Sequence, residues 1–552
     1  MPGKEIEILD DAHSSTSTLA ASSNGDLLGK TSDAIAADVP PGVDRRSFLI
    51  RSAVVGAAAL MTGRTLSAAD RTYDAVRTMP PALNITRGLY VHRVDKGPIM
   101  TTFDELFKVG PGPSSSHTIG VMRSTFDFSQ RITKLDAEKL AKATTLQVNL
   151  FGSLSATGKG HGTERAALAG LIGKEPATVD PLFLDGLKQN PDQSFNVKVG
   201  SKEIPVTLKN IIYDATKGAF PHQNTLVAHL LDASGEDIYS LEYYSIGGGF
   251  IEWKGYTPPN KQAPKYPFET MKELRAHADG NKLSIAQVIL ANEMSIMGRS
   301  EAEMNVIIDK VINAMLLTVK AGLQVPETDI LPGPIKLHSK AAAVYKRAMD
   351  DVNVADRGVG LLAACAIAAS EENARGHLVI TAPTGGSAGV LPSLVYAMSE
   401  ARKIPIEKLR EALLTAAGVG YIIKHHATFA AAEGGCQAEI GSASSMAAGM
   451  VAAAHSAESR VVENAAESAL EHHLGLTCDP VAGFVQVPCI ERCAFGAVKA
   501  WTAYAIASNE IANNHRVGFD ECVQALAETA KDMNSKYKET SEAGLALSVV
   551  LC

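Results

Sequence analysis

Cysteine is the first residue type in this sequence whose placement could support chemistry. The chain has seven cysteines, and six of them follow residue 430. Three occupy positions typical of loops or helix starts: Cys436 follows two glycines, Cys478 precedes Asp-Pro, and Cys489 follows a proline. A thiol at such a position can have a lowered pKa and can bind a metal. The apolar surroundings of Cys365 predict a buried thiol without chemistry instead, and the same is expected of Cys522.

The spacing of these thiols does not by itself choose between kinds of metal site. The sequence has no Cys-x-x-Cys pair, which argues against zinc ribbons and ferredoxin-type sites. Three scattered thiolates could hold a cubane cluster and leave one iron without a protein ligand. Cys552 ends the chain, where a displaceable ligand is easier to place than a permanent one.

Hydroxyl and imidazole side chains gather in the segment 109–120, which is rich in glycine and proline. Proline fixes φ and glycine permits unusual turns, so this stiff loop can present N–H groups and hydroxyls to an anion. Five consecutive polar residues are the candidates for this role: Ser114, Ser115, Ser116, His117 and Thr118. Serine and threonine are also common helix caps, so the loop alone is weak evidence.

Two further segments carry side chains that could take part in chemistry. Residues 151–163 follow a predicted strand and place Lys159 and His161 among glycines. Thr384 precedes a Gly-Gly-Ser-Ala-Gly stretch that begins at Gly385 and is typical of an anion site at a helix start. That stretch matches neither a Walker A motif nor a dinucleotide-binding fingerprint.

Proton transfer near neutral pH favours histidine as the base. His161 and His117 are therefore the first candidates. Lys159 and Lys424 are weaker candidates, because a lysine must be strongly desolvated to act as a base. Other histidines, His222 and the pair 425–426, are expected to be ordinary surface or core residues.

The elements that must position these residues predict a multidomain protein. Residues 97–253 alternate helical patterns with β-branched runs at 145–151, 195–199 and 238–244, which predicts an α+β domain. Residues 254–267, with four prolines and three lysines, are predicted to be a linker. Residues 268–552 are predicted to form a predominantly α-helical catalytic domain. Its long alanine-rich stretches include 358–374, 406–423 and 495–513.

Length and composition exclude several classes of protein. The 552 residues are 46% hydrophobic and 20% charged, which is typical of folded domains and is too long for one core. A net charge of −8 provides no basic field for nucleic acid. No run of about 18 apolar residues is present, so we expect no membrane span.

The first 96 residues are predicted to be a disordered extension. Within it, residues 44–69 combine two arginines, a short apolar stretch and a small-x-small site, which resembles a twin-arginine export signal. The eight acids and two lysines before Arg45 argue against that interpretation. Cytoplasmic location and export to the periplasm therefore both stay open.

Taken in order, the polar and thiol segments resemble the iron–sulfur-dependent L-serine dehydratases, in particular the single-chain bacterial type that joins β and α parts. The resemblance covers about residues 97–552. It rests on Gly-Pro-Ser-Ser-Ser-His-Thr at 112–118, Gly-Ser-Leu-Ser-Ala-Thr-Gly-Lys-Gly-His at 152–161, Thr-Ala-Pro-Thr at 381–384, Gly-Cys-Gln at 435–437, and Thr-Cys-Asp-Pro with Pro-Cys-Ile-Glu-Arg at 477–492.

The resemblance implies an L-serine ammonia-lyase, which converts L-serine to pyruvate and ammonia. It implies a [4Fe–4S] cluster held by Cys436, Cys478 and Cys489, with Cys552 on the fourth iron until substrate displaces it. That iron would act as a Lewis acid on the substrate hydroxyl. The expected substrate-binding residues are Ser114, Ser115, Ser116, Thr118, Thr384 and Gly385, and we expect a homodimer.

Two positions depart from the family pattern. The family usually has asparagine where this chain has Gly385, so Thr384 or backbone N–H groups must replace that amide. Position 493 is usually not cysteine. Cys493 would lie about one helical turn from Cys489 and could compete as a ligand.

Three alternatives differ in class from a cluster lyase. A pyridoxal-phosphate lyase would need a lysine for the imine, and none stands out in the sequence. A structural or electron-transfer metal–thiolate protein would have its metal fully ligated by protein. An exported amino-acid-binding protein would use the serine-rich loop without chemistry.

Overall fold

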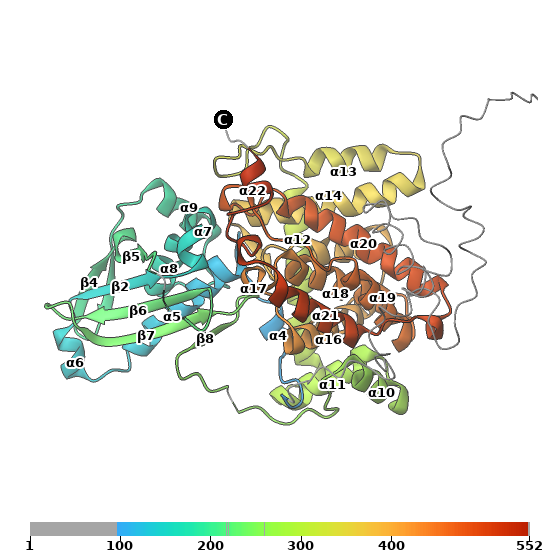
Figure 1. Cartoon of the computed structure of the whole chain (residues 1–552), viewed down its shortest axis with the longest axis horizontal. Helices are drawn as coiled ribbons and strands as arrows, with labels where there is room; N and C mark the ends of the chain where they lie inside the picture. The colour runs from blue at the N-terminus through green and yellow to red at the C-terminus, as the bar shows by residue number, and fades with distance from the viewer. Residues whose placement is uncertain (1–95, 217, 219, 259, 550–552) are drawn as a thin grey trace, which may run out of the picture. The chain divides into compact units, whose positions relative to one another are not determined.

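The structure, a computed structural model, describes residues 96–549 except 217, 219 and 259. From Lys96 onward the chain forms one compact unit (Figure 1). The predicted disordered extension, the twin-arginine-like segment and Cys552 lie outside the described residues. Among the residues described, none of the helices combines the length and the apolar character that crossing a membrane requires. The protein is mixed in secondary structure and mostly helical.

The first half contains a five-stranded sheet. Its strand order is β5 (Ile211–Tyr213), β2 (Thr145–Leu150), β6 (Thr225–Leu231), β7 (Asp237–Ser245) and β8 (Ile251–Trp253). β2 runs parallel to β5, and the other neighbours are antiparallel. Burial alternates along β2, with Leu146, Val148 and Leu150 facing the core, as a strand with one covered face requires. The three predicted strands are confirmed as β2, β3 (Phe195–Val199) and β7.

Helices complete this α+β half and cover the sheet (Figure 1). α5 (Gly120–Ile132) packs on β6 and β7 and against α8 (Thr163–Leu171). The remaining elements are α6 (Ala137–Lys142), α7 (Ser153–His161), α9 (Pro181–Gln189) and β4 (Lys202–Val206), which pairs with β3. Phe128, Leu168 and Tyr243 are fully buried in the core between sheet and helices.

The second half is built almost entirely of helices. They are α10 (Met271–Asn281), α11 (Ile285–Met297), α12 (Glu301–Gly322), α13 (Ala341–Asp350), α14 (Val354–Arg375), α15 (Val390–Tyr396), α16 (Ile406–His426), α17 (Ala431–Gly434), α18 (Ser442–Ala454), α19 (Ser459–Glu471), α20 (Cys489–Asn509), α21 (Phe519–Asp532) and α22 (Leu545–Ser548). The predicted helices at 358–374 and 406–423 are confirmed as α14 and α16. The third, predicted at 495–513, is α20, which ends at Asn509.

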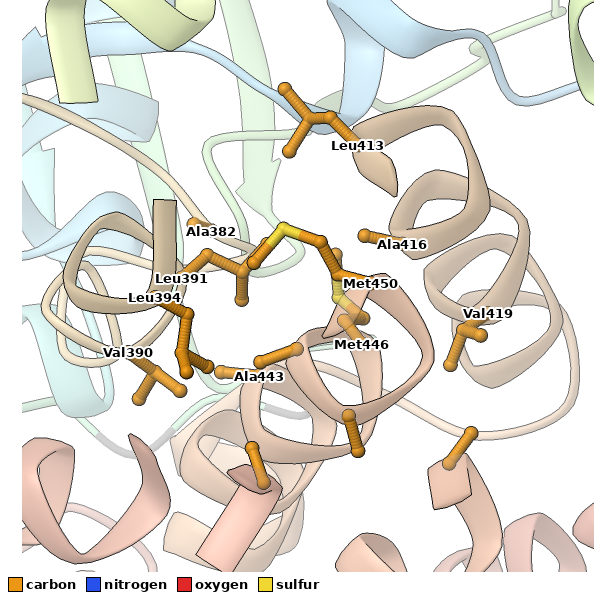
Figure 2. Packing of buried hydrophobic residues seen from close by; sticks show 14 of the residues in the cluster. Ala382, Val390, Leu391, Leu394, Leu413, Ala416, Val419, Ala443, Met446 and Met450 are labelled. Atoms are coloured by element: carbon orange, nitrogen blue, oxygen red, sulfur yellow. The ribbon is translucent and has the colours of Figure 1, made fainter. Parts of the chain in front are cut away.

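The core of the helical half lies around α15, α16 and α18. Figure 2 shows Leu391, Leu413 and Met446 of these helices meeting among small residues such as Ala416 and Ala443. Alanine lets helices approach closely while losing no side-chain entropy. The alanine-rich sequence therefore produces tightly packed central helices rather than an aromatic core.

A short segment before the α+β half packs on the helical core. Phe103 and Leu106, in α4 (Phe103–Leu106), belong to that core. The backbone N–H of Phe103 donates to Glu293 Oε1 at 3.0 Å. The N–H of Ile99 donates to the carbonyl of Phe268 at 3.0 Å. Among the described residues of 254–267, neither a helix nor a strand is found. The domain boundaries placed at 97, 254 and 268 stay predictions.

Two of the polar segments are partly regular. Residues 109–120, expected as a loop, contain β1 (Val109–Pro111) and a π-helical turn, Ser115–Ile119, and residues 151–163 contain α7 (Ser153–His161). The glycines of α7 serve close approach. A Cβ at Gly158 would lie 2.6 Å from the Tyr213 ring, and one at Gly160 would lie 2.5 Å from the carbonyl oxygen of Gly483.

Candidate active site

A short strand pair brings two polar segments together across the two halves. β1 pairs antiparallel with β9 (Leu378–Ile380), with Val109 opposite Ile380. Just beyond the strands, Asn373 Nδ2 donates to the carbonyl of Pro113 at 2.7 Å. A Cβ at Gly385 would lie 2.7 Å from the backbone nitrogen of Ser115. The chain therefore needs glycine at 385 for this close approach.

Several predicted substrate-binding hydroxyls have partners within the protein. Ser114 Oγ accepts from the backbone N–H of His117 at 3.1 Å. Thr118 Oγ1 donates to the carbonyl of His161 at 3.0 Å. Thr384 Oγ1 lies 2.9 Å from Ser387 Oγ. These bonds fix the segments around the histidines, and the contact of these residues with substrate stays a prediction.

His117 and His161 meet as a buried pair. Their ring centroids are 4.4 Å apart and both side chains are fully buried. His117 has hydroxyl partners on both nitrogens: Ser116 Oγ at 2.9 Å from Nδ1, and Thr157 Oγ1 at 3.0 Å and Ser153 Oγ at 3.1 Å from Nε2. Burial, followed by the neighbouring His161, holds the pKa of His117 well below its usual range.

His161 presents a free lone pair. Its Nδ1 lies 2.9 Å from the carbonyl of Thr157, so the Nδ1 proton donates there and Nε2 is left as an acceptor. Nε2 has no hydrogen-bond partner among the described residues. Burial lowers the pKa of His161 to about 4, so the ring is neutral at physiological pH. Of the two histidines, His161 is the one whose nitrogen can accept a proton from a ligand.

The last described stretch of the chain runs along the Cys478 segment. The N–H of Cys478 donates to the carbonyl of Tyr537 at 2.8 Å, and the N–H of Glu539 donates to the carbonyl of Cys478 at 2.9 Å. Further on, Asp479 Oδ2 accepts from the N–H of Leu545 at 2.6 Å. These bonds fix the C-terminal segment beside a predicted metal ligand.

Glu539 is a site residue that sequence reasoning missed. Its Oε1 lies 3.8 Å from His117 Nδ1 and 3.9 Å from His161 Nε2. Burial, with the nearby Cys436 thiol, raises the pKa of Glu539 to about 8. The surrounding sequence, Lys-Tyr-Lys-Glu-Thr, is polar and suggests an exposed tail. Only the pairing with Cys478 turns this side chain inward, so no local signal could have found it.

The three thiols predicted as ligands are buried, and two of them lie close together. Ligating atoms of Cys436, Cys478 and Glu439 all lie within 4.8 Å of one another. A hydrogen bond from Cys478 lowers the pKa of Cys436 to about 7. The same bond, with burial, raises the pKa of Cys478 well above its usual range. This hydrogen bond therefore makes Cys436 the more acidic of the two thiols.

Cys489 and Arg492 complete the thiol group. Cys489 is the first residue of α20 and is buried, and its pKa is raised by burial and then by the charge of Cys436. Burial alone would lower the pKa of Arg492, but the thiolates of Cys436 and Cys489 raise it. Arg492 also donates to the carbonyl of Thr477 at 2.6 Å. A partly buried guanidinium thus compensates the charge that the thiolates would carry.

The other described thiols have different surroundings. Cys493 Sγ donates to the carbonyl of Gly386 at 3.2 Å, and burial raises its pKa to about 12. Cys365 and Cys522 are buried and burial raises the pKa of both. The prediction of core thiols at 365 and 522 agrees with this placement. Whether Cys493 competes as a ligand stays open.

The weaker candidates lie elsewhere. Lys159 is exposed, with its ammonium 5.9 Å from the Tyr213 ring, at the rim of a cavity of about 140 Å³ that His161 also lines. Lys424 lies over the Phe250 ring at 4.0 Å. His222 forms an ion pair with Glu433 at 2.9 Å. None of these three contacts involves the histidine pair or the thiols.

The donor set fits a [4Fe–4S] cluster. Three buried cysteines without disulfides supply thiolates, and Arg492 offsets part of their charge. Soft thiolates are the ligands that iron–sulfur clusters prefer. Three protein thiolates for four irons leave one iron open to another ligand.

Comparison with known proteins agrees with this arrangement. Residues 102–256 match the family described as serine dehydratase beta chain, and residues 280–546 match serine dehydratase alpha chain. The protein named L-serine dehydratase of Streptomyces coelicolor is 37% identical over 461 residues, which cover 82% of this chain and 100% of that protein. L-serine dehydratase of Haemophilus influenzae is 36% identical over 461 residues with the same coverage. L-serine dehydratase 2 of Escherichia coli is 37% identical over 466 residues, again 82% and 100%. Because the match spans these relatives end to end and includes both the histidine-bearing and the thiol-bearing segments, the chain belongs to the serine dehydratase family, with the beta- and alpha-chain regions in one polypeptide.

Proposed function

We propose that this chain is an L-serine ammonia-lyase, a carbon–nitrogen lyase that converts L-serine to pyruvate and ammonia. Cys436, Cys478 and Cys489 would hold a [4Fe–4S] cluster. Cys552, outside the described residues, would be its displaceable fourth ligand. We also expect a homodimer, as the resemblance in the sequence implies. Sedimentation velocity would test this oligomeric state.

One observation carries the proposal: Glu539 lies beside both reactive groups. Its backbone binds Cys478, and its carboxyl lies 3.9 Å from the free Nε2 of His161. A proton acceptor therefore sits next to a thiol set suited to a Lewis-acidic iron. Loss of a Cα proton together with loss of a hydroxyl needs both of these.

The chain's own residues would carry out the proton transfer. A bound cluster would supply a Lewis-acidic iron that makes the substrate hydroxyl a better leaving group. His161 Nε2 takes the Cα proton, because its lone pair faces the site and Thr157 holds the other ring nitrogen. His117 packs against His161 and keeps that ring in place. Once water has left, aminoacrylate tautomerises and hydrolyses to pyruvate and ammonia.

The first test uses protein purified without air. We expect a brown protein with about four irons per chain that forms pyruvate from L-serine and loses this activity in air. A colourless, air-stable protein that forms no pyruvate would overturn the proposal. Replacing L-serine by L-threonine in the same assay measures the preference between the two amino acids.

A further inference from the structure

Glu539 is held in a backbone conformation that side chains rarely adopt. Its φ is +58°, in the left-handed region, which costs about 1 kcal/mol for a residue other than glycine. The two backbone hydrogen bonds with Cys478 and its neighbours enforce this conformation. They turn the carboxyl of a residue in a polar tail into the buried site, where the side chain is 5% exposed.

The Glu539 carboxyl is not needed to orient the histidines. His117 already has hydroxyl partners on both nitrogens, and Thr157 already fixes the Nδ1 proton of His161. Oε1 lies beyond hydrogen-bond distance from both rings, at 3.8 and 3.9 Å. A role like that of the aspartate in a catalytic triad therefore does not account for this side chain.

Two buried polar atoms of this site, Glu539 Oε2 and His161 Nε2, have no hydrogen-bond partner among the described residues. A buried carboxyl oxygen without a partner is costly. A ligand group with N–H donors and a positive charge would satisfy Glu539 Oε2 and would favour the ionised carboxylate, while leaving His161 Nε2 free for the Cα proton. The α-ammonium of an amino acid is such a group.

We infer that Glu539 forms the subsite for the α-ammonium of the substrate. This assignment rests on the proposed function and adds a specificity-determining residue to it. The ammonium nitrogen is bonded directly to Cα, so seating it on the Glu539 carboxylate brings the Cα proton toward His161 Nε2. The hydroxyl and carboxylate of the substrate are left to face the thiol group and the serine-rich segment. Discrimination against hydroxy acids without an amino group follows from the same charge pair.

The test compares two ligands that differ only in the ammonium group. In Glu539→Gln we expect the KM for L-serine to rise about 10- to 100-fold, the loss that follows removal of a hydrogen bond to a charged group. The inhibition constant of 3-hydroxypropionate, which is L-serine without its amino group, should stay within about twofold of the wild type. Glu539→Asp keeps the charge and should lose less L-serine affinity than Glu539→Gln.

Direct binding and a matched control separate recognition from folding. Calorimetric titration of L-serine into the cluster-loaded His161→Gln protein measures affinity with turnover strongly slowed, and adding Glu539→Gln should weaken that affinity by the same factor. Glu542→Gln, an exposed glutamate in the same segment, should change neither constant. Equal losses for both ligands, or an unchanged KM in Glu539→Gln, would overturn the assignment. A wild-type protein that forms no pyruvate would instead contradict the proposed function.

Discussion

The histidine region of the α+β half and the thiol region of the helical half are positioned by different forces. Both rings of the histidine pair are fixed by neutral hydrogen bonds: nearby hydroxyls are the partners of His117, and His161 Nδ1 donates to the carbonyl of Thr157. The thiols are coupled by charge instead, through the Cys436–Cys478 hydrogen bond and the Arg492 guanidinium. Neutral hydrogen bonds fix a geometry, whereas compensated thiolates prepare a site for a cation.

This difference separates proton transfer from metal binding. Each region has its own set of partners, and Glu539 of the C-terminal segment lies beside both. A substitution in the histidine region should therefore abolish proton transfer and leave metal binding intact. A substitution in the thiol region should abolish metal binding and leave the histidine region intact. The following variants test that separation.

The largest effect is expected from Cys436→Ser. Losing the thiolate at the centre of the coupled group should remove the cluster, so iron content and visible absorption should fall to background and pyruvate formation should stop. Iron analysis and absorption spectra of anaerobically prepared protein measure this. Cys522→Ser, at a buried thiol outside the group, is the matched control and should keep its iron. A Cys436→Ser protein with full iron content would remove Cys436 from the ligand set.

His161→Gln should lower kcat by about 10²- to 10⁴-fold, the usual contribution of a general base. Its iron content should match that of the wild type, because the thiol region keeps its own partners. Steady-state kinetics and iron analysis on the same sample test both statements. His472→Gln, at an imidazole that is 65% exposed, is the control. If His161→Gln kept wild-type kcat, another group would have to be the base.

A buried carboxyl away from both regions shows what burial alone does. Glu293 accepts from Tyr421 Oη at 2.6 Å, and burial raises its pKa to about 7, from 4.5 in the unfolded chain. Because the folded-state pKa is the higher one, stability should be lost as pH rises from 4.5 through 7. In Glu293→Gln the free energy of unfolding should fall by about 3 kcal/mol less over this pH range than in the wild type. Chemical denaturation of both proteins at pH 5 and pH 8 measures it, and identical pH dependence would contradict the assignment.

The smallest effect is expected at the contact between the two regions. A Cβ at Gly160 in α7 would lie 2.5 Å from the carbonyl oxygen of Gly483, so Gly160→Ala should lower stability by about 1–3 kcal/mol. The shift of α7 should also lower kcat, since His161 ends that helix. Gly186→Ala in α9, where nothing lies within 4 Å, should be neutral or slightly stabilising. A Gly160→Ala protein as stable as wild type would mean that α7 and the Gly483 turn can separate freely.

Local patterns predicted the regular elements well. The β-branched run at 145–151 predicted β2, and alanine-rich stretches predicted α14 and α16. No such pattern predicted the glycine-containing helix α7. Those glycines allow contact with Tyr213 and with the Gly483 segment, and such contacts leave no periodic signal.

The sequence by itself determined the family, the α+β and α-helical character of the two halves, and the candidate histidines and thiols. These follow from the order and type of the residues in the motifs. Tertiary structure decided which of these side chains meet, and how. It left His161 Nε2 free while giving His117 partners on both nitrogens, it placed Lys159 at an exposed rim, and it turned Glu539 into the site. These outcomes depend on hydrogen bonds between segments dozens of residues apart, such as Glu539 with Cys478 and Thr118 with His161. No local preference encodes a contact of that kind, since its energy arises only when the chain has brought both partners together.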